Sequence, residues 1–558
     1  MSDNFLLDCF PKGFTPRPQQ KKVLEAIEEA EKSYDKIILC MPTGSGKSPI
    51  AYALGACYGP SFVLTGTKSL QDQYKQSFPY IPVIKGKNNF KCDYLVDNLT
   101  SKSTGFDNFF FPDNSNHTPL IKNIQHYREK KLSCDHGPCT ADLGNKNKVC
   151  LYKADGLCNY YNQRDEGLAS DMAILNYALY FQLKIIPFEL PGMYRNTIIY
   201  DEAHTLEDQV LKFISFSISK KQLDQINIFY KSDEIKNIDN IIKVLDVITN
   251  RCANMLRDIK LIHQEESVPL KKFYDKCVFL YNEISEGPEN FVYEIELDGD
   301  FVKKIKLQPI NIEKYTEKFF TAPKQFFMSA TIDKVNFAKT MGFDYRDMIL
   351  LEIEESPFEL QNRKVVFSNT REISSSKPTF HEDNLAMVRE IENIMRHRNN
   401  ERGLILTSSR ARCEFIFNNL PRELSSRIIE GHAVNLDKTT VQQSLEKHAK
   451  IPNSVLISSS MWEGVDLKDD LARFSILEKC PYPYLGDERI KKKSKQDYNW
   501  YSYNTLTKIL QGMGRCVRNE NDYATVYSLD KKIEIILKRH KSMVPTSYHD
   551  MIYLKEKL

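Results

Sequence analysis

Short apolar runs of strand length recur along the chain, and each is followed by a polar turn. Two of them are Ile37–Cys40 and Thr197–Tyr200, and two more lie in the stretches GLILTSS at 403–409 and SVLISSS at 454–460. A continuous apolar run of this length is typical of a buried strand whose two faces are both covered. The pattern therefore predicts an α/β fold, with buried strands and covering helices.

Two further segments show other periodicities. VYEIELDGDFVKKIKL alternates about Asp298-Gly299, which predicts a hairpin that returns the chain to the sheet of the first domain. TLTKILQGMGRCVR is predicted to be helical from Thr505 onward. A helix core, with no cofactor site, is also predicted where apolar residues recur at helical spacing. These residues are Ile238, Ile241, Ile242, Leu245, Ile248, Cys252, Met255 and Ile259.

Composition limits the class of protein. The chain has 558 residues, 41% of them apolar and 27% charged, which predicts several domains. A net charge of +3 predicts no general basic coat, so a nucleic-acid path would be a local groove. No apolar run is long enough to span a bilayer, and we expect no signal peptide. Thirteen cysteines in such a chain, which we expect to be cytoplasmic, favour buried thiols, metal or redox chemistry over disulfides.

The strongest local signal is KIILCMPTGSGKSPIAYALG. Here a buried strand is followed by a tight turn and then a helix, which is the context of a phosphate-binding loop. Gly44 and Gly46 let backbone N–H groups face phosphate oxygens, and Lys47 supplies charge for the β- and γ-phosphates. The hydroxyl of Ser48 is suited to Mg²⁺, and the helix N-terminus adds partial positive charge. Met41 departs from the usual pattern, which has a small residue first, but a chance Gly/Ser turn is disfavoured behind a strand.

A pair of acids follows the second strand, in NTIIYDEAHTLED. Asp201 at a strand end is suited to hold Mg²⁺ through water, and Glu202 to orient the attacking water. His204 is placed to couple the nucleotide site to other parts of the chain. Alone, such a pair is more often a solvated loop; with the phosphate loop upstream, catalysis is favoured.

Together with MPTGSGKS, the Asp-Glu-Ala-His motif resembles superfamily 2 helicases. FFMSATID contains Ser329-Ala330-Thr331, which is similar to the coupling motif of that superfamily. WEGVDL at 462–467 and the QxxGRxxR pattern at 511–518 together resemble the XPD/DinG branch. The motifs extend from Arg17 to Asp530, nearly the whole chain. The resemblance implies two RecA-like motor domains, with an inserted iron–sulfur cluster domain and an inserted helical arch domain.

The resemblance also implies roles for particular residues. Arg515 and Arg518, three apart on a predicted helix, would reach the γ-phosphate from one face, although a surface ion-pair face is the alternative. Arg17 and Gln20 would lie by the adenine, with a proline-stiffened loop as the alternative. The expected catalytic residues are Lys47, Asp201, Glu202, Arg515 and Arg518. The expected ATP- and Mg²⁺-binding residues are Arg17, Gln20, Thr43, Gly44, Ser45, Gly46, Lys47, Ser48, Asp201, Asp466, Gln511, Arg515 and Arg518.

Five cysteines lie within 67 residues between the two nucleotide motifs. None of their spacings is the two-residue gap of zinc ribbons, which weakens zinc without excluding it. The flanks VIKGKNNFKC and CNYYNQR resemble those of the iron–sulfur domain of XPD/DinG helicases, which implies a [4Fe–4S] cluster held by four thiolates. The implied ligands are Cys92, Cys139, Cys150 and Cys158, with Cys134 as a spare that is the alternative to Cys139. Free buried thiols are the remaining alternative. A cluster would staple a loop-rich module that splits the duplex beside the DNA path.

The expected domain ranges follow from the motifs and insertions. They are 1–89, 160–206 and 289–340 for the first motor domain, 90–159 for the iron–sulfur domain, 207–288 for the helical arch and 341–558 for the second motor domain.

The expected function is an ATP-dependent DNA helicase that moves on single-stranded DNA, 5′→3′ by resemblance, and unwinds fork or overhang duplex DNA in DNA repair. We expect a monomeric motor with repair proteins as partners and no membrane association. One alternative is a nucleic-acid-stimulated ATPase that remodels RNA or protein–DNA complexes; a non-catalytic scaffold is disfavoured because the catalytic residues are all present. Plausible contacts with DNA phosphates are Thr65, Lys68, Lys85, Lys87 and Lys91. For each lysine, the alternative is a solvated surface charge.

Overall fold

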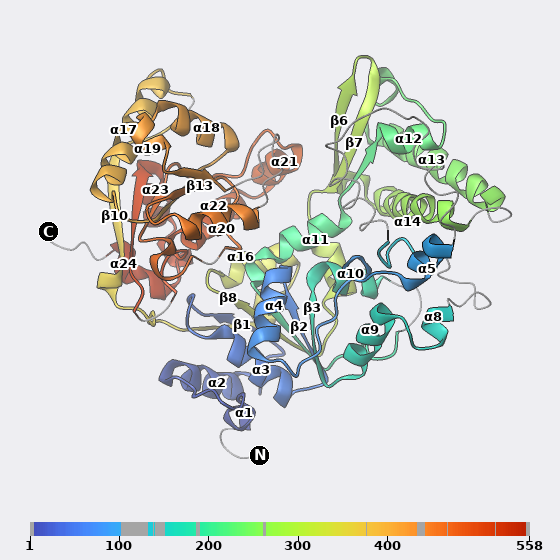
Figure 1. Cartoon of the computed structure of the whole chain (residues 1–558), viewed down its shortest axis with the longest axis horizontal. Coiled ribbons are helices and arrows are strands. Elements are labelled where there is room, and N and C mark those ends of the chain that lie inside the picture. Colours follow the sequence, from blue (N-terminus) through green and yellow to red (C-terminus); the bar gives the residue numbers. More distant parts are fainter. Residues whose placement is uncertain are drawn as a thin grey trace. The chain divides into compact units, whose positions relative to one another are not determined.

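The computed structural model describes residues 5–101, 132–137, 139, 151–185, 190–259, 264–374, 376–431, 441–465, 467–518 and 521–553. These residues form an α/β fold, as the apolar runs predict, and they divide into two compact units. The first unit takes residues up to 59, Asn196–Glu207 and Phe320 onward, and the second takes Pro60–Arg195 and Asp208–Phe319. Each unit is described by itself below (Figure 1).

In the first unit, four neighbouring parallel strands carry the amino-terminal motifs, in the order β4-β8-β1-β9. Their bounds are Thr197–Asp201 for β4, Lys324–Ser329 for β8, Lys36–Cys40 for β1 and Met348–Glu352 for β9. All of β4 and all but the first residue of β1 and β8 are buried, which confirms the expected buried strands. The accompanying helices are α1 (Phe5–Asp8), α2 (Pro18–Ala30), α3 (Lys47–Cys57) and α16 (Lys334–Met341).

The same unit contains a second parallel sheet, in the order β10-β15-β14-β11-β13-β12. Its strands are β10 (Arg363–Arg371), β11 (Gly403–Leu406), β12 (Ile428–Glu430), β13 (Val455–Ser458), β14 (Phe474–Leu477) and β15 (Ala524–Asp530). The predicted runs at 403–409 and 454–460 supply β11 and β13. Their side chains alternate between two cores: Leu404 and Leu406 enter one, and Ile405 enters the other. This alternation explains why the runs are apolar without interruption.

Helices cover both faces of the second sheet (Figure 1). On one face the core includes residues of α22 (Tyr498–Met513), α23 (Lys531–Arg539) and α24 (His549–Tyr553). On the other it includes residues of α17 (Phe380–His397), α18 (Arg410–Asn419) and α19 (Arg422–Ser425). The remaining helices are α20 (Val441–Lys450) and α21 (Glu488–Gln496). Both sheets present the carboxyl ends of parallel strands, where ligands of α/β folds bind.

The second unit begins with a parallel pair, β2 (Ser61–Thr65) and β3 (Met172–Asn176). Between them and around them run α4 (Lys68–Ser77), α5 (Asp93–Ser101), α8 (Leu151–Ala154), α9 (Asn159–Ala169) and α10 (Tyr177–Lys184). The segment from α11 (Leu206–Ile214) onward crosses from the first unit into the second. In the sequence, the expected cysteine insertion therefore lies between β2 and β3.

The rest of the second unit is a helical hairpin packed on a small antiparallel sheet. Its elements are β5 (Phe216–Ser219), α12 (Lys220–Gln225), α13 (Ile238–Ile259), α14 (Gln264–Glu286), β6 (Phe291–Asp298), β7 (Phe301–Pro309) and α15 (Thr316–Phe319). The predicted helix and the predicted β-hairpin are both confirmed. Within the described residues, β7 pairs with β5 and β6, and Ile305 and Leu307 are buried in the core of α13 and α14. After the hairpin the chain re-enters the first sheet at β8, as predicted.

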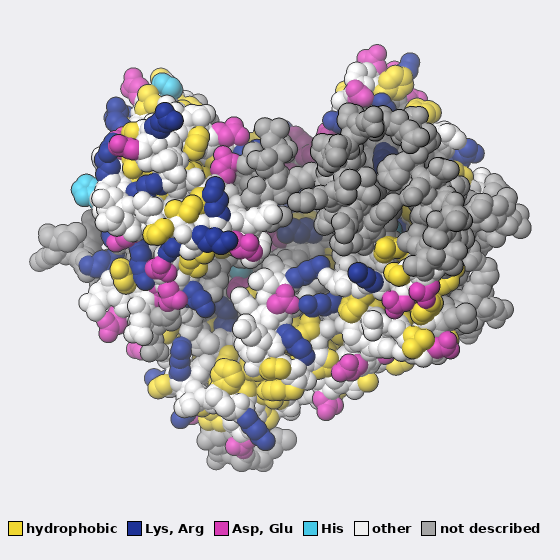
Figure 2. All heavy atoms as spheres, in the orientation of Figure 1, with side chains coloured by type: hydrophobic (Ala, Val, Ile, Leu, Met, Phe, Trp, Pro, Cys, Tyr) yellow, Lys and Arg dark blue, Asp and Glu magenta, His cyan; other side chains and the backbone are white. Residues whose placement is uncertain are grey.

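Charge is mixed over the surface, in agreement with the small net charge. Figure 2 shows Lys and Arg interspersed with Asp and Glu over the face that it draws. Among the described residues, no helix combines the length and the apolar character that crossing a membrane requires.

Candidate active site

The loop between β1 and α3 has the geometry of a phosphate cradle. Gly44 and Gly46 have φ of +79° and +81°, a region that L side chains rarely adopt. A Cβ on Gly44 would lie 2.2 Å from Cζ of Phe358, and one on Gly46 would lie 2.3 Å from Nε2 of Gln20. Both positions therefore require glycine, for the backbone angle and for the space. Gly46 is the N-cap of α3, so the free N–H groups of that helix begin at Lys47.

The start of α2 holds this loop from behind. Nη1 of Arg17 donates a hydrogen bond to the Gly44 carbonyl at 2.8 Å, and Nε2 of Gln20 donates to the Gly46 carbonyl at 3.0 Å. The two are fixed to each other, since the Arg17 N–H donates to Oε1 of Gln20 at 2.8 Å. The carbonyls of Gly44 and Gly46 are thereby fixed to the start of α2, and the Ser45 N–H donates to the Pro42 carbonyl at 3.2 Å. The sequence resemblance expected this pair beside the adenine; its observed contacts are with the loop itself.

The remaining loop residues complete the cradle. Oγ of Ser45 donates to the Pro42 carbonyl at 2.7 Å, which closes the turn. Oγ1 of Thr43 lies near Gly514, 3.6 Å from where a Cβ there would be. Ser48 is the second residue of α3 and is half-buried. Ser48 is thus near the start of the helix, where the expected Mg²⁺ role requires a hydroxyl.

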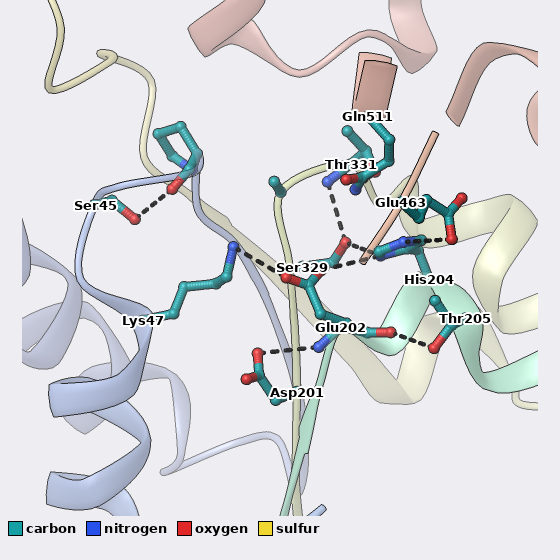
Figure 3. A network of polar contacts seen from close by, with 12 residues as sticks. Ser45, Lys47, Asp201, Glu202, His204, Thr205, Ser329, Thr331, Glu463 and Gln511 are labelled. Carbon is teal, nitrogen blue, oxygen red and sulfur yellow. Dashed lines mark hydrogen bonds and ion pairs between the residues drawn. The ribbon is translucent and has the colours of Figure 1, made fainter. Parts of the chain in front are cut away.

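Asp201 and Glu202 meet the loop at the carboxyl end of β4. Asp201 is buried, and its Oδ1 accepts a hydrogen bond from the Glu202 N–H at 3.0 Å. Glu202 has φ of +54°, a strained conformation for a residue with a side chain. Its Oε1 lies 3.8 Å from Nζ of Lys47 (Figure 3). The strain thus fixes a carboxylate opposite the loop lysine.

The electrostatics of Glu202 favour its ionised form. Burial acts against ionisation, but the positive charges of Lys47, His204, Arg515 and Arg518 outweigh it and hold the pKa of Glu202 below its usual value. Oε2 is buried and has no hydrogen-bond partner among the described residues; Nδ1 of His204 is 3.4 Å away. A buried carboxylate oxygen with an unused acceptor is suited to orienting a water molecule.

A chain of polar contacts runs from the acid pair to α22, a helix that packs on the second sheet (Figure 3). Nδ1 of His204 lies 2.9 Å from Oγ of Ser329, which accepts from the Thr331 N–H at 3.1 Å. Nε2 of Gln511 on α22 then donates to Oγ1 of Thr331 at 2.7 Å. Separately, Nε2 of His204 lies 3.9 Å from Oε2 of Glu463. His204 therefore contacts Ser329 at the end of β8 and approaches Glu463 in the segment after β13, and its coupling role stays a prediction.

Arg515 and Arg518 do not lie on a helix, so the predicted helical face is wrong. The helix α22 ends at Met513 with Gly514 as its C-cap, because glycines at 512 and 514 weaken the last turn. The two side chains still converge, through a shared backbone acceptor. Nη1 of Arg515 donates to the Val465 carbonyl at 2.7 Å, and Nη2 of Arg518 donates to the same oxygen at 3.3 Å. Burial, aided by Arg518, lowers the pKa of Arg515 to about 10.

Three residues that support the site were missed from the sequence. Phe358 packs against Gly44, and the buried Asp522 accepts from the Arg518 N–H at 3.1 Å. Glu207 is buried and accepts from Arg489, from Nζ of Lys493 at 2.8 Å and from Nε1 of Trp500 at 2.7 Å. These contacts join segments far apart in the sequence, and no local pattern marks them. Asp466, an expected nucleotide-binding residue, lies outside the described residues.

Four cysteines of the insertion gather in one small core of the second unit. Cys92, Cys134, Cys139 and Cys158 pack together with Tyr160 and Tyr161. An antiparallel bridge explains the first pair, since the Cys92 N–H donates to the Leu132 carbonyl at 2.7 Å and the Cys134 N–H donates to the Phe90 carbonyl at 2.9 Å. Cys134, expected as the spare, is thus part of the group. Cys150 lies outside the described residues.

The thiols influence one another. The hydrogen bond with Cys134 lowers the pKa of Cys92 to about 7, which favours its thiolate. Nζ of Lys87 lies 3.9 Å from Sγ of Cys139 and 5.6 Å from the ring centres of both Tyr160 and Tyr161. Among the described residues, no three Cys, His, Asp or Glu side chains are arranged to hold a single metal ion.

The expected DNA-phosphate contacts have other partners in the structure. Lys68 donates to Asn89 at 2.7 Å and Lys85 pairs with Asp72 at 2.9 Å, both at the surface. Lys87 points into the cysteine group instead, and burial lowers its pKa. The Lys91 carbonyl accepts from Sγ of Cys134 at 3.2 Å. Thr65 is buried at the end of β2.

Comparison with protein families finds two matches. Residues 391–550 match the family described as "Helicase C-terminal domain". Residues 13–243 match the family described as "Type III restriction enzyme, res subunit". The match at 13–243 contains the phosphate loop and the acid pair, and the match at 391–550 contains Arg515 and Arg518.

Several known proteins resemble the chain over nearly its whole length. The ATP-dependent DNA helicase YoaA of Haemophilus influenzae is 23% identical, over 94% of this chain and 92% of its own. YoaA of Escherichia coli is 21% identical, over 96% of this chain and 94% of its own. A probable ATP-dependent helicase of Methanocaldococcus jannaschii is 22% identical, over 95% of this chain and 93% of its own.

Solved structures show the fold. An XPD helicase structure superposes with a TM-score of 0.62 at 17% identity, covering 94% of this chain and 98% of that one. An apo XPD structure gives a TM-score of 0.54 at 16% identity, covering 92% of this chain and 97% of that one. The two parallel sheets of the first unit therefore correspond to the two RecA-like motor domains that the sequence predicted.

Proposed function

We propose that this chain, a superfamily 2 helicase of the XPD/DinG type, is an ATP-dependent DNA helicase that moves on single-stranded DNA and unwinds duplex. The observation that carries the proposal is the set of charges around Glu202. Glu202 is half-buried: its Oε1 faces Lys47, its buried Oε2 has no hydrogen-bond partner among the described residues, and Arg515 and Arg518 help to depress its pKa. That is the charge arrangement that phosphoryl transfer to water requires.

Each residue of the site has a role in this mechanism. The N–H groups of the loop and Lys47 would bind the β- and γ-phosphates, and Ser48 and Asp201 would hold Mg²⁺, which supplies charge neutralisation when bound. Glu202 would orient the attacking water. Arg515 and Arg518 would stabilise the charge that develops on the transferred phosphoryl group. The adenine-side role of Arg17 and Gln20, and the nucleotide role of Asp466, are retained as part of the proposal.

The polar chain from His204 to Gln511 would report the state of the nucleotide to the second motor domain. Its members contact each other directly, so movement of Glu202 and His204 on hydrolysis would be felt at Thr331 and Gln511. Closure on ATP and opening after hydrolysis would then alternate the grip on DNA. By resemblance we propose 5′→3′ movement, a fork or overhang duplex as substrate, and a cytoplasmic role in DNA repair as a monomer with repair-protein partners.

We further propose that the cysteine group holds a [4Fe–4S] cluster. Four sulfur donors in one core, with a lysine ammonium beside them, are a donor set that suits such a cluster. Cys92, Cys139 and Cys158 are ligands in the sequence-based assignment and are members of the group. We assign the fourth position to Cys134, which is next to Cys92, in place of Cys150. The cluster would fix the fold of the module, since metal binding and folding are coupled in small sites.

The domain ranges expected from the sequence remain our proposal, with one change. The hairpin β6–β7 shares the core of α13 and α14, so we assign it to the helical arch and not to the first motor domain.

Iron retention distinguishes the two ligand assignments. All five Cys→Ser variants at 92, 134, 139, 150 and 158 would be purified anaerobically and their iron counted beside a visible absorption spectrum. We expect iron loss at Cys134 and retention at Cys150. The reverse result would restore the sequence-based set, and stoichiometric zinc in the wild type would overturn the cluster.

The activity itself is tested by two measurements on the same preparation. ATP hydrolysis would be measured with single-stranded DNA and with RNA, and strand displacement with duplexes that carry a 5′ or a 3′ overhang. We expect stimulation by DNA and displacement only from the 5′ overhang. Stimulation by RNA without any strand displacement would favour the alternative, a remodelling ATPase.

A further inference from the structure

Exposed tyrosines and lysines are concentrated in one short segment of the second motor domain. We name this segment the tyrosine–lysine strip. Its members are Tyr482, Tyr484, Lys491, Lys492, Lys495 and Tyr498. Tyr484 is 78% exposed, the highest value among the exposed large apolar side chains of the described residues, and Tyr498 is 59% exposed. Exposed aromatic rings of this kind need an explanation, because single scattered ones are normal but a group is not.

The tyrosines stand on a stiff support. The rings of Tyr482 and Tyr501 stack with centroids 5.7 Å apart and an interplanar angle of 10°, and Oη of Tyr501 donates to the Pro483 carbonyl at 3.1 Å. The ring of Tyr498 packs against that of Tyr501, with their centroids 6.5 Å apart. The ring of Tyr484 lies over Gly486, where a Cβ would be 2.2 Å from its Cζ. One side of the Tyr484 ring therefore rests on backbone while most of its surface stays open.

The helix α21 presents its lysines from a fixed position. Its N-cap Asp487 accepts from the Ile490 N–H at 3.1 Å. On its inner side, Arg489 and Lys493 are buried and bind Glu207. Lys491, Lys492 and Lys495 are exposed on the remaining surface, and only Lys491 has an ion-pair partner in the described part of the chain, Glu488 at 3.1 Å. Lys492 and Lys495 are three apart and so lie on one side of the helix.

We propose that the tyrosine–lysine strip is a binding surface for single-stranded nucleic acid, specifically for the DNA on which the proposed helicase moves. Bases would stack on Tyr484, and Lys492 and Lys495 would contact phosphates. An open aromatic face and unpaired ammonium groups within one short exposed segment fit the two repeating features of a single strand, and stacking is tolerant of sequence. An acidic protein would use the lysines but leave the tyrosines without a role. The inference rests on the proposed function and adds residues to it.

The strip is also connected to the nucleotide site. Glu207 lies three residues beyond His204, and it binds α21 through Arg489 and Lys493 and α22 through Trp500. The helix α22 continues to Gln511 and ends just before Arg515. DNA held on the strip would therefore act on the same pair of helices that leads to the catalytic arginine.

Binding of labelled oligothymidylate, measured by fluorescence anisotropy at several salt concentrations, tests the strip. Tyr484→Ala should weaken binding about 5- to 150-fold, the loss of one stacked base. Lys492→Gln with Lys495→Gln should reduce the slope of log affinity against log salt by about 1.4, since each phosphate contact on a single strand contributes about 0.7. ATP hydrolysis without DNA should be unchanged in both, since none of these residues is in the nucleotide site.

Matched controls exist in the same chain. Tyr194 is 71% exposed and lies in the other unit, and Lys447 and Lys450 are exposed and three apart on α20. Tyr194→Ala and the double Lys447→Gln, Lys450→Gln variant should bind DNA as the wild type does. Photo-crosslinking with 5-iodouracil DNA should label Tyr484 in the wild type. If strip and control variants bind alike while the wild type binds DNA, the strip is not the surface and the proposed function stands; if the wild type itself binds no DNA, both proposals are overturned.

Discussion

The nucleotide site and the cysteine group are built in opposite ways. The nucleotide site sits on parallel strands whose side chains are almost all buried, so its loop, acid pair and arginines are positioned by a large apolar core. In the part of the chain that the structure describes, the cysteine group has a core of Cys92, Cys134, Tyr160 and Tyr161, with a few partly buried neighbours. The nucleotide site can be rigid without any ligand, whereas the described residues of the cysteine group supply little apolar area to stabilise it.

This difference predicts whether a substitution at each site removes activity or structure. In the nucleotide site, substitution of one functional side chain should remove chemistry and leave the fold. In the cysteine group, loss of one thiol should release the bound group and loosen the module, because binding and folding are coupled there. The predictions below test that contrast.

The largest effect is expected at the arginines. Arg515→Ala or Arg518→Ala should lower the DNA-stimulated turnover of ATP by about 10³- to 10⁵-fold, the range of arginine contacts in other phosphoryl-transfer enzymes. Nucleotide binding should persist, which fluorescent-nucleotide titration would measure. Arg346→Ala, at an exposed ion pair with Asp344, is the control. Normal turnover in both arginine variants would remove them from the mechanism.

Lys47→Ala should lower turnover by roughly 10²- to 10³-fold, the cost of losing one preorganised charge contact to the reacting phosphate. The thermal unfolding midpoint should stay near that of the wild type, since the loop is held by Arg17 and Gln20 and not by Lys47. Lys32→Ala, at an exposed surface position, is the matched variant and should leave turnover unaffected. A folded Lys47→Ala protein with near-normal turnover would refute the phosphate-loop assignment.

Cys158→Ser should have the opposite outcome to Lys47→Ala, with the module loosened and the hydrolysis of ATP retained. We expect loss of iron and of strand displacement, with ATP hydrolysis stimulated by single-stranded DNA largely retained, because the nucleotide site is built on its own buried strands. Cys9→Ser, outside the insertion, should keep both iron and unwinding. Equal loss of hydrolysis and unwinding in Cys158→Ser would show that the two regions are not independent.

The smallest effect is expected at Lys87. Lys87→Met removes the ammonium beside Sγ of Cys139 and should weaken iron retention against a chelator by about 10- to 100-fold, as for other partners of metal ligands. Lys85→Met removes a nearby surface lysine that pairs with Asp72 and is the control. Equal iron release from the two variants would show that Lys87 does not support the cluster, and Lys87 would again be a candidate for contact with DNA phosphates.

Local pattern predicted much of the fold because local causes dominate there. Buried strands such as β1 and β4 follow from uninterrupted apolar runs, and α13 follows from helical spacing. The end of α22 at Met513 was missed because the apolar pattern continues past it, while Gly514 ends the helix and carbonyl acceptors hold Arg515.

Contacts made over long sequence distances could not be predicted. Cys134 joins Cys92 through a backbone bridge, although 41 residues separate the two in the sequence, and no spacing rule predicts that bridge. Phe358 on Gly44 and Trp500 on Glu207 are likewise products of the tertiary fold. The motifs of the nucleotide site were visible in the sequence because their residues follow strand ends directly.

Coupled measurement of ATP hydrolysis and strand displacement on the Glu202→Gln variant tests the central claim most directly. The amide keeps the size of the side chain and removes the charge that faces Lys47, so ATP and DNA should still bind while turnover and unwinding of a 5′-overhang duplex fall together. Asp72→Asn, at an exposed ion pair with Lys85, should leave both rates unchanged. Wild-type rates of hydrolysis and unwinding in Glu202→Gln would contradict the account.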